Sequence, residues 1–497
     1  MLFQSTRNKN LKVSPAEAIL RGLSEDGGLF VPETVPKLTD EEMNQMLKMS
    51  YCERANLILS KFLTDFSAEE IAECTKKAYI GRFEKDLPTP LTKLGENTYV
   101  LELWHGPTCA FKDLALQILP HFLVRAEGKN EKKRKAVILT ATSGDTGKAA
   151  LEGFCDVEGT NILVFYPEDG VSKIQKLQMQ TQQGNNVGVF GIKGNFDDTQ
   201  TAVKKIFTDE KMKALLEKSG AHFSSANSIN AGRLLPQIVY YVSAYLDLLA
   251  DGEIKSGEVI NIAVPTGNFG NILAAYYAKR MGIPIKKLIC ASNANHVLTD
   301  FFETGIYNKN REFYVTESPS MDILISSNLE RLLFEFSDRD DSLIESWMES
   351  LQKTGQYEIS GMVKERLDQL FYAGSCDDNE AEKQIRKLFE EYSYLCDPHT
   401  AVVMNVYEHY RKETEDGTKT VVASTASPYK FPQTVLKAIS GSASDNEFAA
   451  AEELERCSNL PIPCSLKELG QKEIRFSGVY EKDEMEDLIR TRFGGGA

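Results

Sequence analysis

The sequence predicts an α/β fold, with mostly parallel sheets flanked by helices and a helical region before them. Beyond about residue 95, short runs rich in β-branched residues alternate with helical stretches, and a Gly-rich turn follows several of these runs. The 497 residues exceed what one core usually holds, so two or three domains and a deep pocket are expected. In such sheets ligands bind beyond the carboxyl ends of the strands, where these turns lie.

The expected elements follow in order along the chain. Residues 1–95 contain the helix-like segments SPAEAILRGL and DEEMNQMLKMSYCERANLILSKF, with the Gly-rich loop SEDGGLFVPE between them. Apolar runs predict strands within 135–142, 161–167, 185–194, 258–271, 286–293 and 419–432. Helices are expected from Lys148, from about Asp198 and from about Gly270. Residues 303–391 are acidic and helical, and we expect an insertion or cover.

The composition excludes several classes of function. The net charge of −15 argues against a partner that is nucleic acid or an acidic membrane. No apolar run approaches the length of a membrane span, and the start MLFQSTRNKN lacks the pattern of a secretory signal. Nine scattered cysteines without a CxxC motif indicate free thiols in a reducing cytoplasm. Six scattered histidines without HExxH make a metal site unexpected.

Lys112 stands in an unusual place for a long cation, within the apolar stretch CAFKDLALQ after a Gly-Pro turn. If a helix starts after Thr108, the helix dipole and desolvation by Phe111 both lower the pKa of the Lys112 amine. A neutral amine can form a Schiff base with an aldehyde cofactor. The plain alternative is a lysine that extends its tip to solvent, with Asp113 as a surface partner.

Three polar loops could bind anions. In VPTGNFGN a strand ends at Val264, and a Gly-rich turn leads into a helix near Gly270. Such a turn could bind a phosphate at the helix N-terminus, or it could be an ordinary connection from strand to helix. The stretch TSGDTGKAA fails the P-loop pattern of nucleotide hydrolases, but its hydroxyls and N–H groups suit a carboxylate or a helix N-cap. SANSINAGRLLPQ contains one arginine and several polar side chains, which could form a second anion site. The alternative is that it is a solvated helix end. Together with a reactive lysine, these loops predict a site for pyridoxal 5'-phosphate (PLP) and an amino-acid substrate.

The order of the motifs HGPTCAFKD, TATSGDTG, NSINAGRL, PTGNFGN, DPHTAVV and STASPYKF resembles the threonine synthase family, as does GLSEDGGLFVPE near the N-terminus. The resemblance runs from about Gly22 to Ile439. It implies fold-type II of the PLP enzymes, similar to the tryptophan synthase β subunit, with two open, mostly parallel sheets and a helical N-terminal domain. It also implies a lyase of threonine biosynthesis that converts O-phospho-L-homoserine and water to L-threonine and phosphate, as a monomer or homodimer.

The same resemblance implies domains and residue roles. The domains would be 1–95 at the N-terminus, 96–127 with 225–440 for cofactor binding, 128–224 closing over the substrate, and 441–497 as an extension. Lys112 resembles the PLP lysine, which would also be the catalytic base. The other cofactor-binding positions are Gly267, Asn268, Phe269, Gly270 and Asn271 for the phosphate, and Thr425 at the pyridine nitrogen. The substrate-binding positions are Ser143, Gly144, Asp145 and Thr146 for the carboxylate, and Ser228, Asn230 and Arg233 for the phosphate.

Some positions depart from the family pattern. Asn271 replaces a frequent Asp, Ser427 replaces His, Tyr429 replaces Ala, and Cys109 stands where an aliphatic residue is common. Because of these changes, a related PLP lyase that eliminates phosphate and releases a 2-keto acid is an alternative function. A non-catalytic protein that retains the fold is a further alternative, against which Lys112 speaks.

Overall fold

A six-stranded sheet forms the larger half of the molecule. The computed structural model describes residues 1–84, 87–130, 133–142, 144–168 and 171–493. The strand order is β14-β11-β10-β15-β5-β4, and only β4 runs antiparallel to its neighbour. The strands are β4 (Leu91–Leu94), β5 (Thr98–Glu102), β10 (Ile260–Pro265), β11 (Ile285–Ser292), β14 (Phe371–Ser375) and β15 (Thr420–Ser424).

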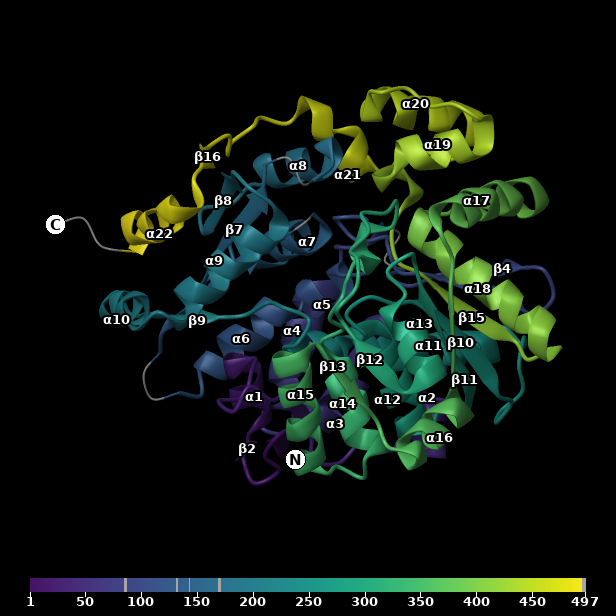
Figure 1. Ribbon diagram of the computed structural model, residues 1–497, viewed down its shortest axis with the longest axis horizontal. Coiled ribbons are helices and arrows are strands. Elements are labelled where there is room, and N and C mark those ends of the chain that lie inside the picture. Colours follow the sequence, from purple (N-terminus) through teal and green to yellow (C-terminus); the bar gives the residue numbers. More distant parts are fainter. Residues whose placement is uncertain (85–86, 131–132, 143, 169–170, 494–497) are drawn as a thin grey trace.

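A second sheet has five strands, all parallel, in the order β16-β8-β7-β6-β9, with β16 (Val479–Tyr480) at one edge. Four of them come from one stretch of chain: β6 (Lys135–Ala141), β7 (Thr160–Pro167), β8 (Val187–Ile192) and β9 (Ala221–Ser224). Its helices are α7 (Asp145–Phe154), α8 (Lys173–Gln180), α9 (Phe196–Thr208) and α10 (Glu210–Lys218). Figure 1 shows this sheet at the upper left, apart from the six-stranded one. The predicted α/β class with two mostly parallel sheets is confirmed, while the domain boundaries stay a prediction.

Helices cover the six-stranded sheet and fill the space between the two halves. Those that pack on it or on each other are α5 (Asp113–Leu116), α6 (Leu119–Glu127), α11 (Ala231–Ala250), α12 (Gly270–Met281), α13 (Val297–Thr304), α17 (Asp378–Tyr392), α18 (Pro398–Thr414), α19 (Pro432–Ser440) and α20 (Glu447–Ser458). The helix α11 is buried along almost its whole length and contacts α3 (Tyr51–Phe62), α5 and α12. Its apolar side chains therefore join the N-terminal region to the rest of the core.

The N-terminal region combines helices with a small antiparallel sheet that the sequence analysis did not foresee. The sheet has the order β2-β1-β3, from β1 (Phe3–Ser5), β2 (Lys12–Val13) and β3 (Phe30–Pro32). The helices are α1 (Pro15–Arg21), α2 (Asp40–Met46), α3 (Tyr51–Phe62) and α4 (Ala68–Tyr79). Ser50 separates α2 from α3, because it forms a capping box with Glu53 and starts a new helix.

Residues 303–391 are only partly the helical cover that was expected. They contain α14 (Leu329–Phe336), α15 (Asp341–Thr354) and α16 (Gly361–Leu370), and a two-stranded antiparallel sheet of β12 (Ile306–Asn308) and β13 (Gln356–Glu358). They also supply β14, an edge strand of the six-stranded sheet. The helix expected from Lys148 begins earlier, at Asp145, and those expected near residues 198 and 270 begin at Phe196 and Gly270.

The C-terminal segment runs from one half of the molecule to the other. After α20 it passes through α21 (Cys464–Lys467), and then β16 (Val479–Tyr480) pairs with β8 of the five-stranded sheet. The last helix, α22 (Met485–Phe493), packs against α10. Figure 1 shows this segment in yellow along the upper edge. No helix in the described part of the chain is long and apolar enough to cross a membrane.

Candidate active site

A cavity of about 730 Å³ lies where the loops after β6, β10 and β15 meet. We call it the central cavity. It is lined by most of the predicted site residues: Lys112, Asp145, Thr146, Ser228, Arg233, the loop 267–271 and Thr425. The predicted Ser143 lies outside the described residues. Parallel strands bring their carboxyl ends to one edge, which explains how loops so distant in sequence surround one space.

Lys112 lies directly before the short helix α5, and its amine points to polar partners at the cavity wall. The Nζ atom donates a hydrogen bond to Ser320 Oγ at 3.1 Å and lies 4.0 Å from Asp145 Oδ2. Burial lowers the pKa of the Lys112 amine from 10.5 to about 8, and the charges of Lys430 and Arg233 act in the same direction while Asp145 opposes them. A substantial neutral fraction is therefore available near neutral pH, as a nucleophilic amine requires.

Asp113 is a structural anchor and not a surface partner of Lys112. Its buried carboxylate accepts hydrogen bonds from the backbone N–H of Thr108 (2.8 Å) and from Thr108 Oγ1 (2.7 Å). Burial raises the pKa of Asp113 to about 7. The carboxylate closes the turn between Gly106 and α5, and this turn sets the position of Lys112.

Lys430 was missed by the sequence analysis, although it belongs to the motif SPYKF. Its side chain is completely buried, and Nζ forms an ion pair of 2.5 Å with Asp145 Oδ1 and donates to the carbonyl of Thr108 at 3.1 Å. Gln175 Nε2 donates to the same carboxylate at 2.9 Å. Although burial acts in the opposite direction, the charges of Lys430 and Lys112 hold the pKa of Asp145 well below its ordinary value. The carboxylate therefore stays ionised between two lysines.

The loop that precedes α7 is shaped by Gly144. Its φ of 143° is a conformation that side chains rarely adopt, and a Cβ there would lie 2.5 Å from the Gln175 side chain. Thr142 Oγ1 accepts from the N–H groups of Gly144 (3.0 Å) and Gly147 (2.9 Å) and so fixes the turn. The N-terminus of α7 is thereby directed toward the cavity, as a carboxylate site needs.

The predicted phosphate loop leaves β10 and enters α12. A Cβ on Gly267 would lie 2.7 Å from the carbonyl oxygen of Ser320, so only glycine fits there. Phe269 takes a left-handed conformation (φ 64°) at the start of α12. Asn271 Oδ1 accepts hydrogen bonds from the hydroxyls of Tyr240 (2.7 Å) and Tyr241 (2.5 Å), while its buried Nδ2 has no partner among the described residues.

Arg233 and Ser228 line the cavity, but Asn230 does not. The buried Arg233 donates to the carbonyl of Ala226 at 3.0 Å, and its Nε has no partner in the described part of the chain. The amide of Asn230 is fully used: Nδ2 donates to the carbonyls of Ile19 and Ser225, and Oδ1 accepts from the N–H of Gly232. Asn230 is therefore an N-cap of α11 that orients Arg233 instead of a direct anion ligand.

His399 is a second residue that the sequence analysis left unassigned. It lines the central cavity, and its Nε2 accepts the backbone N–H of Ser320 at 3.1 Å. Its Nδ1 donates to Asp397 Oδ1 at 2.7 Å, which fixes the tautomer. The imidazole thus holds the backbone of Ser320, whose hydroxyl faces Lys112.

Thr425 follows β15 and lies at the cavity wall with 6% of its surface exposed. Its carbonyl accepts the N–H of Phe111 at 2.8 Å, which ties the end of this strand to the turn before Lys112. Of the departures from the family pattern, Ser427 and Tyr429 do not line the cavity. The Tyr429 hydroxyl instead donates to the carbonyl of Leu460 at 2.5 Å, in the C-terminal segment.

The donor set fits PLP. The unpaired Nδ2 of Asn271 and the N-terminus of α12 offer donors for a phosphate. The Lys112 amine lies in the same cavity and could form a Schiff base with an aldehyde. Thr425 offers a hydroxyl residue in the wall of the same cavity. The described residues contain no cluster of three or more His, Cys, Asp or Glu side chains that could hold a metal ion.

Comparisons with known proteins agree on one family. Family models match at residues 2–79 (threonine synthase N terminus), 84–426 (pyridoxal-phosphate dependent enzyme) and 400–489 (threonine synthase, C-terminal). The threonine synthase of Pseudomonas aeruginosa is 36% identical over 93% of this chain and 96% of its own length. The structure of the PLP-bound threonine synthase from Brucella melitensis superposes with a TM-score of 0.88 at 36% identity, with 100% of both chains covered.

The human threonine synthase-like 1 protein is 42% identical over 85% of this chain, but the match covers only 58% of that protein. The chain thus spans little more than half the length of this relative.

Proposed function

Since this chain belongs to the threonine synthase family of PLP-dependent enzymes, we propose that it converts O-phospho-L-homoserine and water to L-threonine and phosphate. One observation supports the proposal: the amine of Lys112 shares a single cavity with Arg233 and with the first residues of α7, where we place the two ends of the substrate. The substrate is an anion at both ends, so two such sites hold it across the lysine.

In this proposal Lys112 and Thr425 hold the cofactor, together with the loop Gly267, Asn268, Phe269, Gly270 and Asn271. When bound, PLP withdraws electrons from the substrate's α carbon, which makes the α proton easier to remove. The N-terminus of α12 and the unpartnered Asn271 Nδ2 would hold the cofactor phosphate.

The substrate is held at its two ends. Its carboxylate meets the N–H groups of Asp145 and Thr146 at the start of α7, while Gly144 shapes the turn through its hydrogen bond to Thr142. Ser143 is assigned to the same carboxylate from the sequence alone. Its phosphate meets Arg233 and Ser228, with Asn230 holding the start of α11 in place. These contacts align the γ carbon for loss of phosphate.

Lys112 is the proton carrier. With a pKa of about 8 its neutral form is well populated, so it accepts the α proton and later moves a proton at the β carbon. Ser320 orients the amine by accepting its hydrogen bond, and Asp145 stabilises the ammonium form once the proton has been taken. Phosphate leaves from the γ carbon with the electron pair of the C–O bond, and water adds its hydroxyl at the β carbon. The protons taken from the α carbon, the β carbon and water end on the γ carbon, the α carbon and the leaving phosphate.

Product identification tests the proposal directly. The purified protein, loaded with PLP, is incubated with O-phospho-L-homoserine, and the products are separated and identified. Threonine and phosphate in equal amounts support the proposal, and 2-oxobutyrate with phosphate supports the phospho-lyase. A protein that takes up PLP but forms neither product would favour a non-catalytic role. The Lys112→Ala variant is the matched control and is expected to lose turnover.

We further infer a cytoplasmic location and a monomer or homodimer. All nine cysteines are free, five of them buried within apolar clusters that a reducing compartment keeps as thiols. Cell fractionation and analytical ultracentrifugation test these two inferences, and a secreted or tetrameric protein would contradict them.

A further inference from the structure

We propose that a second cavity beside the central one binds a small carboxylate with an apolar body, such as an arylalkanoate. This side cavity has a volume of about 330 Å³, within the range of small-molecule sites. It lies between the N-terminal region and the segment 325–357, and shares the wall residues Ile229, Lys309, Ile325 and Ser327 with the central cavity. The inference does not rest on the proposed reaction.

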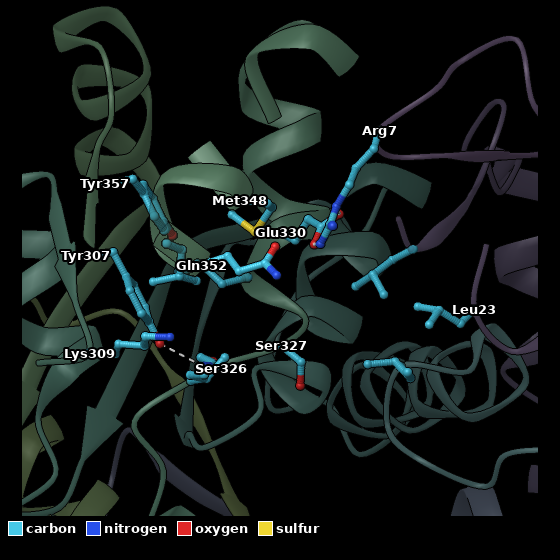
Figure 2. Close-up of a pocket in the computed structure, with 15 residues that line it drawn as sticks. Arg7, Leu23, Tyr307, Lys309, Ser326, Ser327, Glu330, Met348, Gln352 and Tyr357 are labelled. Carbon is cyan, nitrogen blue, oxygen red and sulfur yellow. Dashed lines mark hydrogen bonds and ion pairs between the residues drawn. The ribbon is translucent and has the colours of Figure 1, made fainter. Parts of the chain in front are cut away.

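The lining of the side cavity is mainly apolar. Leu29, Leu329, Met348 and Leu351 contribute aliphatic surface, while the stacked rings of Tyr307 and Tyr357 form one side. Figure 2 shows these two tyrosines facing Leu23 across the cavity. Leu23 is 42% exposed and Ile325 49% exposed, so the rim is apolar as well. An apolar ligand body gains free energy by covering this surface.

One cation in this wall is available to a ligand, and the other is not. Arg7 forms an ion pair with Glu330 at 2.8 Å, and Thr6 donates to the same carboxylate at 2.5 Å, so these groups already satisfy one another. Among the described residues, Lys309 Nζ has no ion-pair or hydrogen-bond partner. In Figure 2 it lies beside the end of Tyr307. A single free ammonium next to an apolar wall suits one carboxylate.

The side cavity is linked to the cofactor loop by hydrogen bonds. Ser326 Oγ donates to the carbonyl of Gly267 at 2.7 Å, and Ser327 Oγ donates to Asn268 Oδ1 at 3.1 Å. Both serines line the side cavity. A ligand that displaces them would move the loop assigned to the cofactor phosphate, so we expect occupancy of the side cavity to change the rate of PLP release.

Calorimetric titration of the PLP-loaded full chain with 3-phenylpropanoate tests the proposal. We expect binding that weakens at least about tenfold with the neutral 3-phenylpropanamide and with Lys309→Met, since a charge-assisted hydrogen bond is lost. Leu351→Trp fills the side cavity and is expected to abolish binding, with the milder Met348→Phe as a second filling variant. Phe313→Ala, which changes the central cavity alone, is the matched control and should retain binding.

Two further measurements decide between the cavities. Saturating inorganic phosphate should leave binding unchanged, and bound 3-phenylpropanoate should alter the rate of PLP release at least twofold, with circular dichroism confirming that each variant is folded. The proposal is overturned if the titration detects no binding, if both filling variants bind normally, or if phosphate displaces the probe, because the probe would then occupy the central cavity. An unchanged rate of PLP release would refute the link to the cofactor loop.

Discussion

Replacing Lys430 by methionine should raise the pKa of Lys112 and slow the uptake of PLP. Lys430 is one of the charges that lower this pKa, and its loss also frees Asp145, 4.0 Å from Lys112, to stabilise the ammonium form. Methionine is chosen because it keeps most of the side-chain volume while removing the charge.

The structure bounds the size of the effect. With a pKa of about 8, roughly a quarter of the Lys112 amine is neutral at a pH of about 7.5. At the ordinary value of 10.5 the fraction would be about one in a thousand. Burial is the main cause of the lowered pKa of Lys112, and it persists in the variant. We therefore expect this pKa to rise by about one unit, which lowers the neutral fraction roughly tenfold and keeps it above the fraction at the ordinary pKa.

The assay follows the absorbance of the apoprotein as PLP is taken up, at constant ionic strength over about pH 6 to 10. The rate should rise with pH to a midpoint near 8 in the unchanged protein and to a higher midpoint in Lys430→Met. Lys430→Arg retains the charge and is expected to keep the lower midpoint. An unchanged or lowered midpoint in Lys430→Met would refute the reasoning.

Stability gives an independent check on the same pair. Removing Lys430 leaves the buried carboxylate of Asp145 without its closest partner, which costs about 3 kcal/mol of unfolding free energy. In the double variant Lys430→Met, Asp145→Asn both charges are gone, so we expect most of that loss to be recovered. Denaturant titrations of the apoproteins measure the difference.

Three further predictions concern other groups of the same protein. Burial depresses the pKa of Lys112, so its charge destabilises the folded apoprotein below about pH 8 and ceases to do so as the pH rises past 10.5. Lys112→Met should therefore raise the unfolding free energy at neutral pH by up to about 3 kcal/mol, and denaturant titration at neutral and at strongly alkaline pH checks both limits. Gly144→Ala should lower the unfolding free energy by at least about 1–2 kcal/mol more than the control Gly220→Ala. A Cβ at residue 144 would lie 2.5 Å from the Gln175 side chain, whereas nothing lies within 4 Å of a Cβ at residue 220. Equal losses of stability in thermal denaturation would contradict this. Burial acts against protonation of His105, but hydrogen bonds to two glutamates raise its pKa from 6.5 to about 9. Protonated His105 therefore stabilises the folded state fully below pH 6.5, and this contribution is lost as the pH rises through 9. His105→Gln should lower the unfolding free energy by about 1–2 kcal/mol in mildly acidic solution and by nothing measurable above about pH 10, with the value reduced for solvent screening.

The elements that the sequence predicted well are those with local signals. The strand and turn before α12 are adjacent in sequence, so periodicity and glycines suffice to place the loop 267–271. The apolar neighbours of Lys112 in the sequence likewise predicted that its side chain is buried. Lys430 has the same kind of signal in SPYKF, where it stands between the aromatic residues Tyr429 and Phe431.

The missed features depend on contacts between distant parts of the chain. Ser320 approaches Lys112 from more than two hundred residues away, and His399 approaches Ser320 from another helix. Asn230 illustrates the opposite error, since the preference of asparagine for helix N-caps was the signal for a structural role. The strands β14 and β16 have five and two residues, too few for a period of two to be visible.

The pairing of β16 with β8 has a consequence for synthesis on the ribosome. Four strands of the five-stranded sheet are complete by Ser224, but the fifth lies within the last twenty residues of the chain. One edge of β8, with its unpaired backbone groups, therefore stays open for as long as it takes to translate more than half of the protein. We expect nascent chains to need protection at that edge until β16 has been synthesised.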